Sequence, residues 1–250
     1  MKPSILIPTY NRPKRLRRAL DSIMEQTIPC EVVVVDGGSR YGLSPMLDGT
    51  RWDDRHDCRS HQFPAPGPGF LPTWYTATAL ATGDVCHFQL DDDWIDPTFM
   101  ERTVAELTDD VSCVLTQSTV HFEDGRPDQQ NMDLMPARSG KVPGGVMVSI
   151  MMNIPLTITP ASATMRRQDV LDFLPVGRIP NAPRRTNCAD AYMMLSLFAS
   201  RPYVYWIADS LAHLGAHADG FTVSRLEGED RGADLVAQYS EVKTAWMRNR

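Results

Sequence analysis

Three consecutive carboxylates, Asp91, Asp92 and Asp93, are the residues of this sequence with the clearest chemical potential. They follow an apolar segment at 85–90 that favours a buried strand. Adjacent carboxylates repel one another, so such a run is costly unless it is solvated or shares a cation. Oxygen ligands suit Mg²⁺ or Mn²⁺, and Mg²⁺ sites commonly combine one or two carboxylates with substrate phosphates. The run therefore predicts either a metal and nucleotide site or a solvated acidic turn.

The elements that precede the acidic run favour the first of these interpretations. Segments 4–8 and 31–36 are short and continuously apolar, as is typical of parallel strands covered on both faces. Between them, residues 13–26 carry apolar side chains at helical spacing. Strand, helix, strand and an acidic turn at Asp36 form the first half of a nucleotide-binding α/β fold. Open sheets of this kind bind ligands at the carboxyl ends of their strands, where Asp36 and the acidic run both fall.

The rest of the chain continues to alternate helices and strands. Further helices are expected at about 73–81, 98–107, 146–154, 190–198 and 230–246, and further strands at 111–122, 157–165 and 203–207. The polar, Pro- and Gly-rich segment 123–145 is expected to be a long loop that closes over a bound ligand. We expect one α/β domain with a nucleotide-binding half at 1–110, an acceptor-binding half at 111–225 and a terminal helix at 226–250.

Composition limits the function classes. The chain has 25 basic and 31 acidic residues, and its formal charge of −6 argues against a broad nucleic-acid surface. The odd number of cysteines and their wide spacing favour free thiols in a reducing compartment over a zinc site; they are Cys30, Cys58, Cys86, Cys113 and Cys188. The chain shows no secretory signal pattern and no apolar run of about 18 residues. A cytoplasmic location is expected, with any membrane association being peripheral.

Five short segments in a fixed order make the chain resemble the family 2 glycosyltransferases of the GT-A fold. These segments are 4–12 (SILIPTYNR), 34–39 (VVDGGS), 81–93 (ATGDVCHFQLDDD), 187–190 (NCAD) and 214–222 (LGAHADGFT). The resemblance covers roughly residues 3 to 225. It implies an α/β fold in which a Rossmann-like nucleotide-binding half and an acceptor-binding half share one mostly parallel central sheet.

The resemblance also implies roles for individual residues. Asp190 would be the general base of an inverting transfer. The nucleotide sugar would be bound by residues of the first two strand ends and of the acidic run: Pro8, Thr9, Tyr10, Arg12, Asp36, Gly37, Asp91 and Asp92. A divalent metal, Mn²⁺ or Mg²⁺, would be held by Asp91, Asp93 and His217.

The sequence departs from the family pattern at two of these positions. The acidic motif of many relatives reads Asp-x-Asp-Asp, and the position that matches its first Asp is Leu90 here. Asp91 and Asp93 are the preferred metal-binding pair, and Asp92 with Asp93 is the alternative. The residue before the base is often Glu in the family and is Ala189 in this chain.

From the residues alone, simpler roles stay open. Asp190 is also suited to cap a helix, Asp36 to form a turn, and His217 to be an ordinary polar residue. The leading hypothesis is a metal-dependent, inverting glycosyltransferase that uses a nucleotide-diphosphate sugar. The resemblance favours UDP, because it implies that Asp36 accepts a hydrogen bond from a pyrimidine N–H. The alternatives are a sugar nucleotidyltransferase, against which the lack of a Gly-rich basic loop counts, and a non-catalytic nucleotide-sugar-binding module.

The acceptor and the oligomeric state are not defined by the sequence. A glycan, a lipid-linked sugar, a small molecule, a protein or a hydroxylated base in DNA all remain open as acceptors. Arg178, Arg184 and Arg185 lie shortly before Asp190 in the chain and predict contact with an anionic acceptor.

Overall fold

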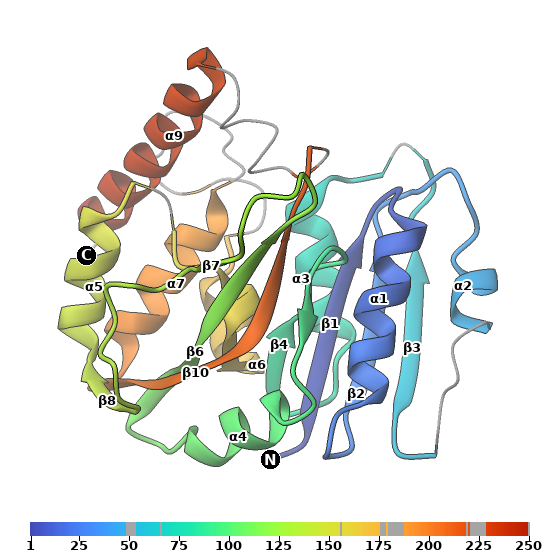
Figure 1. Ribbon diagram of the computed structural model, residues 1–250, viewed down its shortest axis with the longest axis horizontal. Coiled ribbons are helices and arrows are strands. Elements are labelled where there is room, and N and C mark those ends of the chain that lie inside the picture. Colours follow the sequence, from blue (N-terminus) through green and yellow to red (C-terminus); the bar gives the residue numbers. More distant parts are fainter. Residues whose placement is uncertain are drawn as a thin grey trace.

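Ten strands form one sheet in the part of the chain that the computed structural model describes, and helices pack on both faces of it (Figure 1). The described residues are 1–48, 54–65, 67–155, 157–175, 179, 188–218, 220 and 229–249. The strands are β1 (Pro3–Thr9), β2 (Glu31–Asp36), β3 (Asp57–Gln62), β4 (Val85–Phe88), β5 (Trp94–Ile95), β6 (Val111–Phe122), β7 (Gln129–Gln130), β8 (Gly140–Pro143), β9 (Ala163–Arg166) and β10 (Tyr203–Ala216). The helices are α1 (Pro13–Met24), α2 (Ser44–Asp48), α3 (Phe70–Leu80), α4 (Phe99–Glu106), α5 (Gly144–Asn153), the short 3-10 helix η1 (Pro160–Ser162), α6 (Arg167–Phe173), α7 (Ala189–Ser200) and α9 (Glu229–Arg248).

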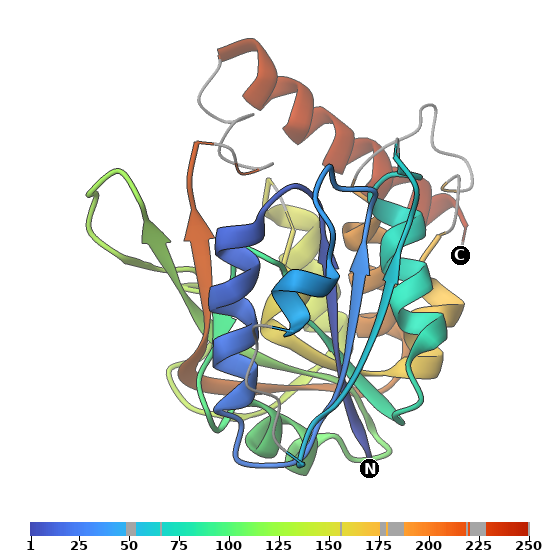
Figure 2. The same ribbon diagram turned by 90° about the vertical axis from the view of Figure 1, so that its right-hand side faces the viewer.

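The first half of the sheet is parallel. The strand order is β3-β2-β1-β4-β9-β6-β10-β5, and the first four of these strands run in the same direction. Alternate residues of β1 and β2 are buried on opposite faces, where Ile5 joins one apolar core and Leu6 the other. Figure 2 shows α1 and α3 on the two sides of these strands. The continuous apolar runs of the sequence therefore correspond to strands covered on both faces.

The second half of the sheet is mixed. Strand β9 lies antiparallel between β4 and β6, while β6 and β10 run parallel to each other. The strands of 1–110 and of 111–225 thus share one sheet. Helices α5, α7 and α9 pack beside this half, with α7 in contact with both other helices.

Three sequence expectations fail in this half. The strand expected at 157–165 begins only at Ala163, because Pro160 begins the 3-10 helix η1. The strand expected at 203–207 extends to Ala216. Its pairing with β6 shifts register after Ile207, and the apolar pattern of the sequence is interrupted there, so the pattern does not reveal the rest of the strand. The segment 123–145 contains two short strands, and β8 pairs with residues 203–206 at the beginning of β10. About ten residues of extended strand, roughly 30 Å, separate that point from the end of β10. The expectation that segment 123–145 closes over a bound ligand is therefore wrong for β8, because β8 pairs with the beginning of β10, far from the end of β10.

Close backbone packing fixes the turn after β2. Gly38 adopts φ +94°, which favours glycine, and a side chain on Gly67 would overlap the carbonyl oxygen of Gly37. We expect Gly67→Ala to lower the free energy of unfolding by about 2–3 kcal/mol, because backbone atoms cannot yield as a flexible side chain can. Chemical denaturation measures this change. Gly145→Ala in α5 is the control, since nothing lies within 4 Å of the added methyl group and stability should not fall.

Candidate active site

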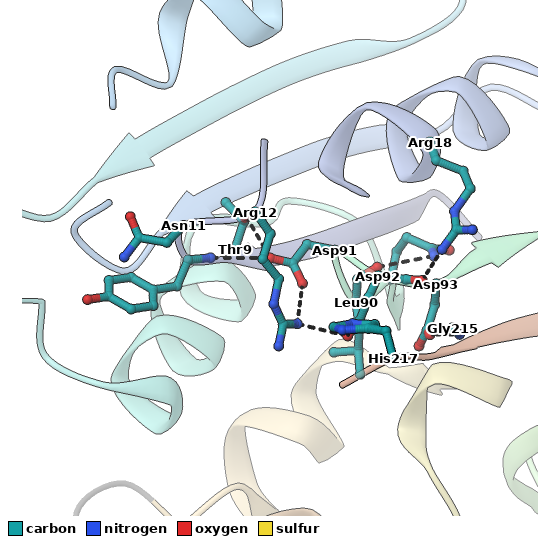
Figure 3. A network of polar contacts seen from close by, with 12 residues as sticks. Thr9, Asn11, Arg12, Arg18, Leu90, Asp91, Asp92, Asp93, Gly215 and His217 are labelled. Atoms are coloured by element: carbon teal, nitrogen blue, oxygen red, sulfur yellow. Dashed lines mark hydrogen bonds and ion pairs between the residues drawn. The ribbon is translucent and has the colours of Figure 1, made fainter. Parts of the chain in front are cut away.

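The acidic run lies at the carboxyl end of β4, beside the end of β1, and Arg12 bridges two of its carboxylates (Figure 3). The Arg12 guanidinium lies 3.0 Å from Asp91 Oδ1 and 2.8 Å from Asp92 Oδ2. The Thr9 hydroxyl donates to Asp91 Oδ2 over 2.8 Å. The structure thus joins residues about 80 positions apart in the sequence into one charged cluster.

The end of β10 completes this cluster from the other side. His217 Nε2 lies 3.0 Å from Asp92 Oδ2, and the Gly215 amide donates to Asp93 Oδ1 over 2.9 Å. Arg18 of α1 donates to the backbone carbonyl of Asp92. Figure 3 shows the Arg12 guanidinium and the His217 ring converging on Asp92, with Asp93 turned toward Gly215. Asp92 is therefore the carboxylate that faces two basic groups.

The three carboxylates differ in proton affinity. Burial and the neighbouring charge of Asp92 raise the pKa of Asp91, and the same two effects raise the pKa of Asp93 well above its usual range. Burial also acts to raise the pKa of Asp92. The hydrogen bond from His217 and the charge of Arg12 outweigh it, so the pKa of Asp92 is lowered. The repulsion that raises two of the three pKa values is what an added cation would relieve.

The donor set suits a divalent cation that also contacts a substrate. Among the described residues, no three His, Cys, Asp or Glu side chains form a metal-binding group. Two protein ligands completed by phosphate oxygens are, however, a common arrangement for Mg²⁺. The His217 Nδ1 atom is buried and has no hydrogen-bond partner within the described ranges. Asp92 and His217 fit the two-ligand case best, while the choice among Asp91, Asp92 and Asp93 stays a prediction.

The residues expected to bind the nucleotide line the ends of β1 and β2. Thr9 and Asp36 are register partners, and the Gly37 amide donates to the Thr9 carbonyl over 2.9 Å. Asp36 is fully buried, and its carboxylate accepts hydrogen bonds from the amide and hydroxyl of Ser39. Tyr10 is 54% exposed at the rim, next to Pro8 and Thr9, which are buried. These residues lie together, and their contacts with a nucleotide remain a prediction.

Asp190 forms a separate carboxylate site in the first turn of α7. Cys188 occupies the N-cap position of this helix, so the interpretation of Asp190 as a cap is wrong. Asp190 Oδ1 accepts from the Ala191 amide over 2.9 Å, and Oδ2 accepts from the Tyr239 hydroxyl over 3.2 Å. Burial raises the pKa of Asp190 to about 6, against the opposing effects of these two hydrogen bonds. A carboxylate with this pKa is ionised at neutral pH and can accept a proton readily.

The helix that carries Asp190 points its first turn toward the site. Only two residues separate the end of α7 from the beginning of β10, so α7 begins toward the end of the sheet that β10 approaches at His217 (Figure 1). The twelve residues of α7 span about 18 Å.

The contacts of Tyr239 and Lys243 with this region were not predictable from the sequence, because no local pattern links them to Asp190.

Asp190→Asn is expected to stabilise the protein by about 1–2 kcal/mol at pH 8. Because the pKa of Asp190 is raised in the folded state, the native protein binds a proton that the unfolded chain has lost between pH 4 and pH 6. Stability is therefore lost as pH rises through this window, and Asn avoids that loss. Urea unfolding at pH 4 and pH 8 measures the difference, which should vanish near pH 4. An equal effect at both pH values would contradict the assignment.

The strand order and the helices on both faces of the sheet give the chain a fold of the GT-A type. The chain belongs to glycosyl transferase family 2, whose family model matches residues 4–174. The confirmed features are the α/β class, the mixed, mostly parallel central sheet and the position of the acidic run at a strand end. Asp190 lies beyond the matched residues.

Three relatives illustrate the similarity. A curated protein of Bacillus subtilis (strain 168), EpsH, which carries a glycosyltransferase name, is 25% identical over 122 residues, 48% of this chain and 35% of its own length. The structure of S. aureus TarS 1-349 in complex with UDP-GlcNAc has a TM-score of 0.67 at 20% identity, covering 96% of this chain and 66% of that one. The mannosyltransferase PcManGT from Pyrobaculum calidifontis, in complex with GDP-Man and Mn²⁺, has a TM-score of 0.61 at 16% identity, covering 99% and 68%. The chain therefore spans about a third of EpsH and about two thirds of the two structural neighbours.

Some sequence features lie outside the described residues. They are Arg178, Arg184 and Arg185, expected to contact the acceptor, together with Asn187, Asp219, Phe221 and Thr222 of the family-like segments. In the part of the chain that is described, no helix has the length and hydropathy that a membrane crossing requires.

Proposed function

We propose that this protein transfers a sugar, with inversion, from a nucleotide-diphosphate sugar to an acceptor hydroxyl, with Asp190 as general base. The observation that supports this most strongly is the pair of carboxylate environments. In the acidic cluster, Asp91 and Asp92 contact Arg12, and Asp92 also contacts His217, which suits a site for a cation and a diphosphate. Asp190 stands apart from it, with a pKa of about 6. Carboxylates in such different environments are suited to different tasks in one reaction.

The chemistry assigns a task to each group. Transfer breaks the bond between the anomeric carbon and the diphosphate, so negative charge develops on the departing group. A divalent cation, Mn²⁺ or Mg²⁺, held by the acidic cluster would stabilise that charge as a Lewis acid, worth several kcal/mol. Arg12 would bind the same phosphates once the nucleotide is present, because its guanidinium is a fixed donor for their oxygens. Asp190 would take the proton of the attacking hydroxyl, typically for a factor of ~10²–10⁴.

A UDP-sugar is the favoured donor. The carboxylate of Asp36 lies at the end of β2 and uses part of its acceptor capacity on Ser39, which leaves lone pairs for a pyrimidine N–H. TarS was solved with UDP-GlcNAc and PcManGT with GDP-Man, so donors with both bases belong in the test. None of the five cysteines forms a disulfide and four are buried, which fits the cytoplasmic location proposed here.

The acceptor is proposed only as a class, a hydroxyl compound whose anionic portion is met by Arg184 and Arg185. The double change Arg184→Ala and Arg185→Ala should weaken acceptor binding and reduce its salt dependence. If acceptor affinity and its salt dependence stay unchanged, the acceptor is not anionic at this position. The proposed donor site is unaffected by that result.

Thermal unfolding with a panel of nucleotide sugars tests the donor site. Each donor is added with Mn²⁺, with Mg²⁺ or with EDTA. Because a ligand specific for the native state stabilises it by RT ln(1 + [L]/Kd), the correct donor should raise the Tm by several degrees with metal and far less with EDTA. A panel in which no donor changes the Tm, with or without metal, would overturn the proposal.

A further inference from the structure

The C-terminal helix α9 holds the carboxylate proposed as the base. Neither α9 nor α7 lies within residues 4–174, which the family model matches. One face of α9 is buried against the domain, through Leu235, Tyr239, Val242 and Trp246. Among the described residues, the side-chain hydrogen bonds that join α9 to α7 include Tyr239 to Asp190 over 3.2 Å, and Trp246 Nε1 to Ser196 Oγ over 3.1 Å. Only the first of these two bonds reaches the base.

The hydrogen bonds of Asp190 leave it free to accept a proton. An ionised carboxylate offers about four acceptor positions. The Ala191 amide takes one on Oδ1 and the Tyr239 hydroxyl takes one on Oδ2. The remaining positions suffice for a substrate hydroxyl. The two donors lie on different elements and bind different oxygens, so together they fix the plane of the carboxylate.

A buried lysine adds a positive charge to the same region. Lys243 is 4% exposed, and its Nζ donates to the Ile154 carbonyl at the end of α5 over 2.6 Å. Its charge interacts favourably with Asp190 and counteracts the effect of burial on that carboxylate. Among the described residues, the titratable groups that act on Asp190 are Tyr239 and Lys243 from α9, and the Cys188 thiol at the beginning of α7 interacts with both of these side chains.

We propose that Tyr239 and Lys243 are positioning residues, which hold the Asp190 carboxylate in one orientation and keep it ionised for proton transfer. This inference rests on the proposed function, in which Asp190 is the base. Tyr239 donates to the charged form of Asp190, and Lys243 attracts that form. Both residues therefore lower the pH at which the base becomes active. Helix α9 therefore has a role in proton transfer in addition to packing against α7.

The test compares pH profiles of kcat/KM for Tyr239→Phe, Lys243→Met and the control Trp246→Phe. The control removes the hydrogen bond from Trp246 to Ser196 and leaves the Tyr239 hydrogen bond to Asp190 in place. We expect the acidic limb to move upward by roughly one pH unit in each of the first two variants. At pH 6 this is a loss of several-fold, and the loss shrinks toward pH 8, where the activity that is still missing measures the loss of carboxylate orientation. The limb of Trp246→Phe should coincide with that of the wild type.

A second readout does not depend on activity. The carboxyl ¹³C signal of Asp190, assigned by its loss in Asp190→Asn, is titrated in the donor-free protein. Tyr239→Phe and Lys243→Met should each raise the midpoint of this titration. If one variant does not fold, the other variant still tests the inference. Unchanged midpoints and pH profiles in a folded variant would overturn the inference. Full activity of Asp190→Asn would instead overturn the proposed function, so the two failures are distinguishable.

Discussion

Asp190→Asn is expected to lower kcat by about 10²–10⁴-fold while the Kd of the donor stays unchanged. An amide has almost the shape of the carboxylate and cannot accept the proton of the attacking hydroxyl. Asp190 is also separate from the acidic cluster that would bind the diphosphate, since its contacts are with Ala191 and Tyr239. Release of nucleoside diphosphate measures the rate, and isothermal titration measures donor binding.

Asp172→Asn is the matched control for this change. Asp172 is exposed on α6, and its carboxylate accepts from Gln168 one turn away. The same chemical substitution should leave both the rate and the donor affinity unaltered there. Equal rates for Asp190→Asn and the control would show that another group serves as base.

Asp92→Asn is expected to lower kcat/KM by about 10³-fold or more and to abolish the response to added metal. Asp92 is the carboxylate on which Arg12 and His217 converge, at 2.8 and 3.0 Å. An amide oxygen carries no full charge, and an amide NH₂ turned toward Arg12 would repel it. The measurement is the initial rate as a function of Mn²⁺ concentration. In this variant, EDTA should cause little further loss.

Asp-to-Asn substitutions at the neighbouring carboxylates identify which aspartates hold the metal. Asp93→Asn should mainly affect stability, because the Asp93 carboxylate is buried and accepts from the Gly215 amide. Asp209→Asn is the control, since Asp209 is exposed and pairs only with Arg102 among the described residues. If metal dependence survives in Asp92→Asn and is lost in Asp93→Asn, the pair Asp91 and Asp93 is the metal site.

The apolar pattern of the sequence predicts those strands and helices that are buried in the same way along their whole length. The valines of 31–36 and the apolar residues of 111–122 mark β2 and β6 correctly, because each strand is covered along its length. The helix begun by Pro13 is confirmed as well. β10 was predicted only to Ile207, since Ala208, Asp209 and Ser210 interrupt its apolar pattern where its register shifts. A bulged strand keeps its hydrogen bonds without keeping a period of two.

Long-range partners account for what was not predicted in the site. The order of the motifs placed Arg12 and the acidic run in one pocket, but the bridge from Arg12 to Asp91 and Asp92 follows only from the pairing of β1 with β4. The Tyr239 contact with Asp190 spans 49 positions and depends on how α9 packs on α7. The helix expected at 230–246 includes Tyr239. Periodicity alone cannot tell which buried hydroxyl meets a carboxylate.

The measurement that tests the central claim most directly is ³¹P NMR of the protein with its donor and Mg²⁺, which is diamagnetic, at stoichiometric enzyme. Glycosyl transfer to an acceptor, or to water in its absence, breaks the bond at the anomeric carbon. We expect a nucleoside diphosphate to accumulate with wild-type protein, and not with Asp190→Asn or with EDTA. Sugar 1-phosphate and nucleoside monophosphate, produced by cleavage within the diphosphate, would contradict glycosyl transfer and indicate nucleotidyl chemistry. A donor that binds and stays intact would indicate a binding module.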